Sequence, residues 1–422
     1  MRQTVTDTGD VYGLVTEHQF MAWKAAGELA ALLWVPAIRD VNEYRRDLTV
    51  AVANVLDVFS LIDPSKIITK IKLHLLARIN DNAIEFGPLV GVATEIFESF
   101  NATFRYCSIL SNHLALSRDI ALQLGDQEGL KHQLTGGWWF CSAADEWQRA
   151  GPGVRHFMSQ HLVLQRLLEW SEQKLLKHGA CESKLEPLKR GQKNRATYLL
   201  KSTTAANAVN YGLYPSESTW NRCSSVFGEL LDECFAGSWI FAQSATDNNS
   251  TISGRISEIL TNNTATTVVV LEVFQVLAAR DEIYGMPVLV RRDGETVFTI
   301  IPAKNVKFKV NVQHDCHTAK CEATGVRPRM QERVESDQIE NFIVHKPLDR
   351  FIINSHAFHN AHLLRATLPR DLVAPILLFD QRREKHDEFA ATLHANWASK
   401  AAKHKAGKAS GKKKGWARAC PT

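Results

Sequence analysis

The chain has 422 residues, of which 45% are hydrophobic and 23% are charged. This composition is typical of soluble globular proteins and excludes a largely disordered, collagen-like or membrane-embedded chain. The formal net charge is +5, but eight of the 50 basic residues follow Glu388 and no acidic residue does, so the rest of the chain has 42 basic against 45 acidic residues, a charge of −3.

Residues 1–180 are predicted to form a helical domain. Apolar residues recur at three- and four-residue spacing between Glu17 and Phe59, which is the period of an amphipathic helix. Asp63 and Pro64 are typical of a helix start and predict a helix that runs to about Ile79.

A row of basic side chains recurs every four residues along that predicted helix. Such a row indicates either a solvated helix face or a surface that contacts the phosphates of a nucleic acid. The residues of this row, called the basic row below, are Lys66, Lys70, His74 and Arg78.

A second amphipathic helix is predicted from about Ala93 to Arg105. Its polar face carries Glu95, Glu98 and Arg105, opposite a face of phenylalanines. Two glutamates three residues apart can face the same metal ion or phosphate oxygen. Carboxylates that hold Mg²⁺ ions activate water and stabilise the leaving oxygen in strand cleavage. A solvated helix surface explains the same pattern, so the sequence leaves both interpretations open.

Residues 181–235 are interpreted as a basic linker and helical connection, and residues 236–312 as a small β domain. Residues 267–276 are a dense β-branched run, and Asp293-Gly294 is typical of a hairpin turn. Apolar and polar residues then alternate from Val306 onward, as expected for a half-buried strand.

Residues 313–398 form a Cys/His-rich and helical segment. Two cysteines separated by four residues, followed by later histidines, are compatible with tetrahedral zinc. Structural roles for the same side chains remain the alternative. The expected zinc ligands are Cys316, Cys321, His345 and His356.

Residues 399–422 are rich in alanine and lysine, and they are predicted to be a disordered basic tail. Such a tail fits nonspecific phosphate contact, or nuclear import through Lys412, Lys413 and Lys414. A solubilising tail is the alternative.

Short motifs spread along the chain resemble transposases of fungal Plavaka-type DNA transposons, which are relatives of the CACTA group. The order of these motifs carries the resemblance, because each piece is short. They lie at residues 72–76, 86–88, 94–101, 104–113, 117–121, 131–139, 147, 284–287, 311–316 and 353–365.

The resemblance implies a cut-and-paste DNA transposase with three catalytic acids on an RNase H-like core. By this likeness the last acid is Glu98, with Glu95 as the second candidate, and Mg²⁺ is the cofactor of a completed site. The first two acids should lie on upstream strands, whereas the residues before Glu98 are helical in pattern. We therefore expect the C-terminal part of a transposase, inactive by itself.

The sequence thus predicts an α+β protein with a helical N-terminal domain, a small β domain, a Cys/His-rich segment and a disordered basic tail. The expected function is DNA binding in the nucleus, through the basic row, Arg105, residues 184–201 and the tail. One alternative is a transposase subunit completed by another chain or by a second copy of itself. The other is a non-enzymatic module that binds protein or chromatin. No membrane association is expected.

Overall fold

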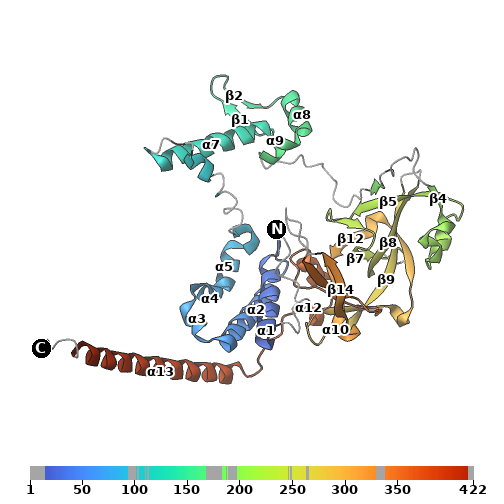
Figure 1. Ribbon diagram of the computed structural model, residues 1–422. Helices are drawn as coiled ribbons and strands as arrows, with labels where there is room; N and C mark the ends of the chain where they lie inside the picture. The colour runs from blue at the N-terminus through green and yellow to red at the C-terminus, as the bar shows by residue number, and fades with distance from the viewer. Residues whose placement is uncertain are drawn as a thin grey trace. The chain divides into compact units, whose positions relative to one another are not determined.

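The computed structural model describes residues 15–93, 101, 104–109, 111, 114–167, 183–186, 188, 197–245, 247, 250–262, 266–328 and 338–416. The chain divides into two compact units, of which the first comprises residues 1–91 and 179–422 and the second residues 92–178. Helices dominate the N-terminal part and antiparallel strands the part that follows (Figure 1), so the expected α+β class is confirmed.

Two long helices open the first unit. Helix α1 (Glu17–Leu33) begins with a capping box between Thr16 and Gln19, and α2 (Val41–Ile62) is capped by Asp40, whose carboxylate accepts from the Glu43 amide. These caps satisfy backbone amides that the helix itself leaves without acceptors. The apolar faces of α1 and α2 pack together in one hydrophobic cluster.

The predicted helix from 63 to 79 is broken into short pieces: α3 (Ser65–Thr69), α4 (Ile71–Leu76) and α5 (Ile79–Phe86). Lys70 has extended backbone angles between the first two pieces. The β-branched run from Ile67 to Thr69 lowers helix propensity at this point. The basic row is exposed, but it does not lie along one regular helix.

The remainder of the first unit is built on a 12-stranded sheet. Its central path runs β12-β7-β8-β9-β10-β16-β13, with β5 also paired to β8 and β11 to β9, and every pairing is antiparallel. The strands are β3 (Ser183–Leu185), β4 (Thr197–Leu199), β5 (Thr219–Phe227), β6 (Glu233–Phe235), β7 (Trp239–Gln243), β8 (Thr251–Asn262), β9 (Thr267–Arg280), β10 (Pro287–Val290), β11 (Phe298–Pro302), β12 (Val306–Val310), β13 (Val312–His314) and β16 (Arg350–Ile353).

The segment 181–235, interpreted from sequence as a linker, contains β3 to β6, which pair within this sheet. The turn at Asp293-Gly294 has the expected positive φ angles of 53° and 74°. The two strands that flank it do not pair with each other, because β10 and β11 both pair with β9, at different ends of that long strand. Strand β12 alternates buried and half-buried residues as predicted.

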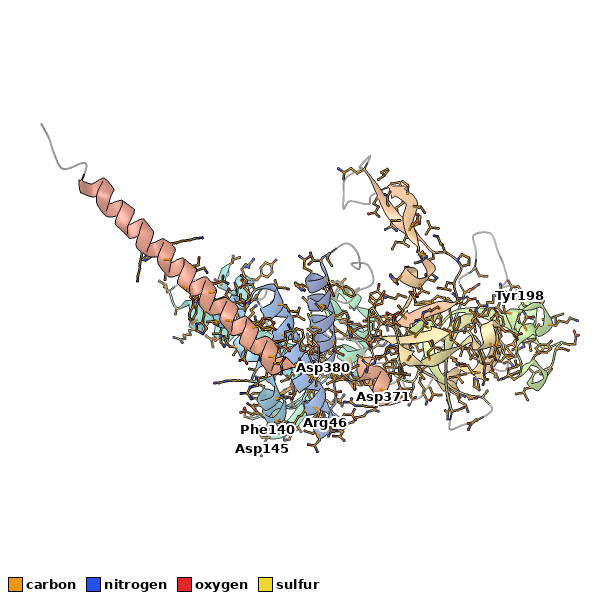
Figure 2. All side chains as sticks on the ribbon, turned by 90° about the horizontal axis from the view of Figure 1, so that it is seen from below. Arg46, Phe140, Asp145, Tyr198, Asp371 and Asp380 are labelled. Atoms are coloured by element: carbon orange, nitrogen blue, oxygen red, sulfur yellow. The ribbon has the colours of Figure 1, made fainter. Side chains whose placement is uncertain are left out.

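Three helices of very different length follow the sheet: α11 (Ala361–Thr367), α12 (Arg370–Val373) and α13 (Arg382–Trp416). Asp371 and Asp380 mark this segment in Figure 2. Disorder is expected from residue 399 onward, but α13 continues as far as Trp416. Alanine and lysine favour helix strongly even without a partner surface, which accounts for the difference.

Buried carboxylates on α2 attach the N-terminal helices to this C-terminal segment. Asp47, 4% exposed, accepts hydrogen bonds from Arg365 at 2.9 Å and from Arg370 at 2.6 Å. Asp57, 1% exposed, accepts from Arg382 Nε at 2.7 Å and also contacts His386. These ion pairs join residues that are more than 300 positions apart in sequence.

The second unit contains α7 (Leu116–Leu134), the hairpin of β1 (Trp138–Cys141) and β2 (Glu146–Arg149), α8 (Pro152–Gln160) and α9 (Leu162–Leu167). The hairpin lies where only helices are expected from the sequence. In the described part of the chain no helix is both long and apolar enough to cross a membrane.

The substitution Asp47→Ala should destabilise the protein strongly, because it leaves the largely buried Arg365 without its carboxylate. We expect a loss of about 3–5 kcal/mol in the free energy of unfolding, the usual cost of breaking a buried ion pair. The measurement is urea denaturation followed by circular dichroism.

The matched control is Glu43→Ala, since Glu43 pairs with Arg370 at the surface, where its side chain is 43% exposed. This change should cost less than about 1 kcal/mol. Equal effects of the two substitutions would contradict the role of the buried carboxylate.

Candidate metal centre

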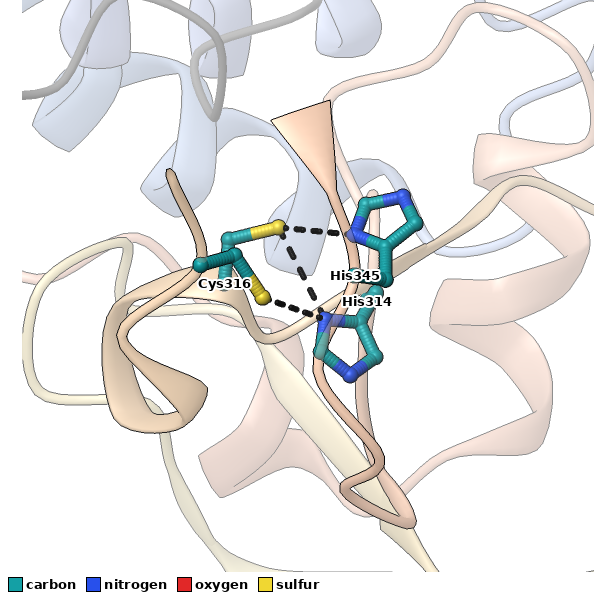
Figure 3. Close-up of side chains that lie close together, drawn as sticks. His314, Cys316 and His345 are labelled. Carbon is teal, nitrogen blue, oxygen red and sulfur yellow. Dashed lines mark hydrogen bonds between the residues drawn. The ribbon is translucent and has the colours of Figure 1, made fainter. Parts of the chain in front are cut away.

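Four potential metal ligands converge beside the edge strand β13. His314 ends β13, Cys316 begins α10 (Cys316–Ala319), and Cys321 immediately precedes β14 (Glu322–Pro328). His345 follows β15 (Ile339–Val344), the strand that pairs with β14. Figure 3 shows the two imidazole rings facing the two thiols. These four residues are called the His/Cys cluster.

Three of the six separations between the ligand atoms match the edges of a small tetrahedron. Sγ of Cys316 lies 3.6 Å from Nδ1 of His314 and 3.3 Å from Nδ1 of His345, and Sγ of Cys321 lies 3.7 Å from Nδ1 of His314. All four ligand atoms lie within 4.8 Å of one another. A tetrahedral zinc ion with bonds of about 2.3 Å to sulfur and about 2.0 Å to nitrogen would separate its ligands by about 3.3–3.8 Å.

The backbone between the cysteines holds them in this arrangement. The Cys321 amide donates to the Cys316 carbonyl at 2.9 Å, and Lys320 takes the left-handed conformation that ends α10. Asp315 caps α10 by accepting from the Thr318 amide and also accepts from Arg350 of β16 at 2.6 Å. These hydrogen bonds define the geometry of the loop that carries both cysteines.

The electrostatics of the cluster suit metal binding. Burial, with a further contribution from the neighbouring His345 ring, lowers the pKa of His314, while backbone groups of Leu348 and Lys346 oppose that shift. The neutral imidazole is the form that binds a metal ion. The Lys346 amide donates to Sγ of Cys321 at 3.3 Å, a contact that supports a thiolate.

The structure brings together three of the four predicted zinc ligands and corrects the fourth. Cys316, Cys321 and His345 belong to the His/Cys cluster, and His314 takes the place predicted for His356. His356 is buried at another place, against Gly27 of α1. Its neighbour His359 is held by Asp232, with Nε2 2.8 Å from the carboxylate.

The other predicted site residues fall in several parts of the chain. Glu95 and Glu98 lie outside the described residues. Arg105 is exposed in the second unit, and the basic row is exposed in the first. Lys412, Lys413 and Lys414 fall within α13, but their side chains also lie outside what the structure describes.

Residues 183–373 match a family model described as a domain of unknown function (DUF8590). The matched segment begins at β3, ends at α12 and contains all four residues of the His/Cys cluster. No curated protein and no solved structure matches the chain.

Protonation of His356 should make the stability of the protein depend on pH. Burial, and then the positive charges of Lys24, Arg365 and Arg280, lower the pKa of His356 from 6.5 to about 3. The unfolded chain therefore binds a proton that the folded chain does not. The stability that the protein gains from burying His356 in its neutral form is complete above pH 6.5. It is lost as the pH falls toward 3, at about 1.4 kcal/mol per pH unit.

Urea denaturation at several pH values across that window should show a shallower pH dependence for His356→Gln than for the unmodified protein. His18→Gln, an exposed change on α1, is the control and should leave the dependence unaltered. Parallel curves for His356→Gln and the unmodified protein would contradict the burial of a neutral histidine.

Proposed function

We propose that the His/Cys cluster binds one zinc ion and that the chain is a zinc-stabilised, non-enzymatic DNA-binding protein derived from a transposase. The two thiols and two imidazoles at tetrahedral spacing carry the first half of this proposal. Thiolate sulfur and imidazole nitrogen are the ligands that zinc prefers, whereas Mg²⁺ requires oxygen.

The surroundings of the cluster support a structural role for zinc. Strands β14 and β15 form a separate two-stranded sheet in which nearly every residue is exposed. A hairpin with so little buried apolar surface is marginal in water by itself. An ion held by His314 and Cys316 on one side and by Cys321 and His345 on the other would fasten the base of this hairpin to the main sheet.

The ligand count also favours structure over catalysis. Four protein side chains fill a tetrahedral shell and leave no position for a reacting water, as in structural rather than catalytic zinc sites. The two glutamates carried over from the transposase resemblance lie outside the described residues. We therefore propose no catalytic step, and Mg²⁺ enters only if another chain completes an active site.

The distribution of charge supports DNA as the partner. Beyond Glu388 the chain carries only basic charge, and Lys400, Lys403 and Lys405 are exposed on α13. A helix with this charge neutralises phosphates and releases their counterions, which favours nucleic acids irrespective of sequence. The lysine run at 412–414 supports a nuclear location.

Purified protein should contain about one zinc ion per chain by atomic emission, as a single four-ligand site requires. Cys316→Ser and Cys321→Ser should each remove most of this zinc and lower the melting temperature, since a serine hydroxyl binds zinc much more weakly than a thiolate. Cys141→Ser, which changes a free cysteine of the second unit, is the control and should keep its zinc. The site would be refuted if the purified protein contained no zinc and the two cysteine substitutions left its melting temperature unchanged.

DNA binding is tested by fluorescence anisotropy at several salt concentrations, with the full chain and with a chain that ends at Glu388. The full chain should bind duplex DNA with an affinity that falls steeply with salt. Removal of the tail should weaken binding by about tenfold or more. It should also flatten the salt dependence, by about one unit of slope for each phosphate that the shortened chain no longer neutralises.

The triple change Lys400→Gln, Lys403→Gln and Lys405→Gln keeps the helix and removes charge, so it should weaken binding in the same direction. A separate double change, Lys66→Gln with Lys70→Gln, tests whether the basic row also contacts DNA. If the full chain does not bind DNA even at low salt, the better hypothesis is a protein-interaction module that uses the exposed β14–β15 hairpin.

A further inference from the structure

A cavity of about 290 Å³ lies within the first unit, away from the His/Cys cluster. Its walls come from α1, α2, the turn that precedes β10, and the loop between α12 and α13. The volume is near the lower end of the range for pockets that hold small organic ligands, about 300–1,000 Å³. Ile376 and Leu377 on its rim are exposed, so the cavity is open to solvent.

Lys24 and Glu28 of α1 both line this cavity; burial raises the pKa of the Glu28 carboxyl, and the positive charges of Arg365, Arg280 and Lys24 oppose that shift. Lys24 and Glu28 are four residues apart, yet among the described residues no hydrogen bond or ion pair joins their charged groups, and none reaches the Glu28 carboxylate from elsewhere. Lys24 donates one hydrogen bond to the Ile283 carbonyl at 2.8 Å. An ammonium group has three protons, so two remain for another acceptor.

A second positive charge lies on the same wall. The guanidinium of Arg280 is fixed by three backbone carbonyls: Asp371 at 2.7 Å, Ala374 at 2.6 Å and Gly285 at 3.4 Å. Carbonyl acceptors position a guanidinium without neutralising its charge. Arg280 is therefore held in place as a cation, and α12, where Figure 2 labels Asp371, supplies part of its support.

A buried polar group at the cavity also lacks a partner. His356 lines the cavity, is only 6% exposed, and its buried Nδ1 has no hydrogen bond from any described residue. A Cβ at Gly27 would lie 3.2 Å from that nitrogen, so glycine permits the ring to pack against α1. Buried polar groups are usually hydrogen-bonded, and each exception calls for an explanation such as a functional role.

Apolar side chains form much of the remaining lining. Met21, Val58 and Leu378 supply apolar surface. The loop that carries Leu378 is fixed by Asn54, whose amide donates to the Ile376 carbonyl at 2.8 Å and accepts from the Leu378 amide at 2.9 Å. An apolar cavity with a few fixed charges is the usual form of a small-molecule site.

We propose that this cavity binds a small zwitterion with an apolar body, of the chemical class of an α-amino acid. The ligand's carboxylate would accept hydrogen bonds from Lys24 and Arg280, and its ammonium would donate to Glu28. Its apolar part would lie against Met21, Val58 and Leu378. Each charged group of such a ligand meets a protein side chain that forms no ion pair with any described residue.

Ligand-observed NMR titration of the full chain tests this assignment with three probes that share the same phenylethyl group. L-phenylalanine carries both charges, 3-phenylpropionate only the carboxylate, and 2-phenylethylamine only the ammonium. L-phenylalanine should bind most tightly. Lys24→Gln should weaken its binding, and that of 3-phenylpropionate, by about tenfold, the effect of one charge-assisted hydrogen bond.

Glu28→Gln should weaken L-phenylalanine by a similar factor but should not weaken 3-phenylpropionate, because Glu28 is proposed to accept only from the ligand's ammonium group. Glu17→Gln, an exposed change on the same helix, is the control and should alter neither. Leu377→Trp, at the exposed rim, should block the binding of all three probes without destabilising the hydrophobic core.

Two results would overturn the proposal. One is the absence of L-phenylalanine binding to the unmodified protein. The other is binding that the Lys24, Glu28 and Leu377 substitutions leave unchanged in proteins that melt normally. Neither result bears on zinc or DNA, since no residue of this cavity belongs to the His/Cys cluster or the basic tail.

Discussion

The buried carboxylates of α2 are the constraint on which the first unit depends. Asp47 and Asp57 would be costly to bury alone, and each is stabilised because arginines from the C-terminal segment reach it, with His386 as a further partner of Asp57. Through these contacts α1 and α2 acquire a fixed position against residues 365–386. The cavity has defined walls for the same reason, since part of its lining comes from these helices and part from the far end of the chain.

Local patterns in the sequence predict local structure well. The alternation from Val306 indicates the buried and half-buried faces of β12, and the break at Pro36 separates α1 from α2. Long-range pairing cannot be predicted in this way. The strands of segment 181–235 include short, basic pieces that only their partners in the sheet identify, while β9 is long enough to pair with two different strands in succession.

In the metal centre, too, local features can be predicted from the sequence and long-range contacts cannot. The spacing of Cys316 and Cys321 makes them recognisable, because a short loop between two thiols is a local feature. His356 is predicted as the fourth ligand, but its side chain is buried elsewhere, and its neighbour His359 contacts Asp232. His314 is only two residues before Cys316, and a strand that ends at a histidine before a Cys loop is the signal that identifies it.

The discontinuity of the first unit has a consequence for the order of folding. Residues 47 and 370 are in contact although 323 positions separate them, with the whole second unit and the sheet between. Closing so long a loop makes folding slow and delays this ion pair until the C-terminal segment has been made. During synthesis on the ribosome, α1 and α2 would emerge long before the arginines that pair with Asp47 and Asp57, so the two carboxylates would lack these partners until the last part of the chain is made.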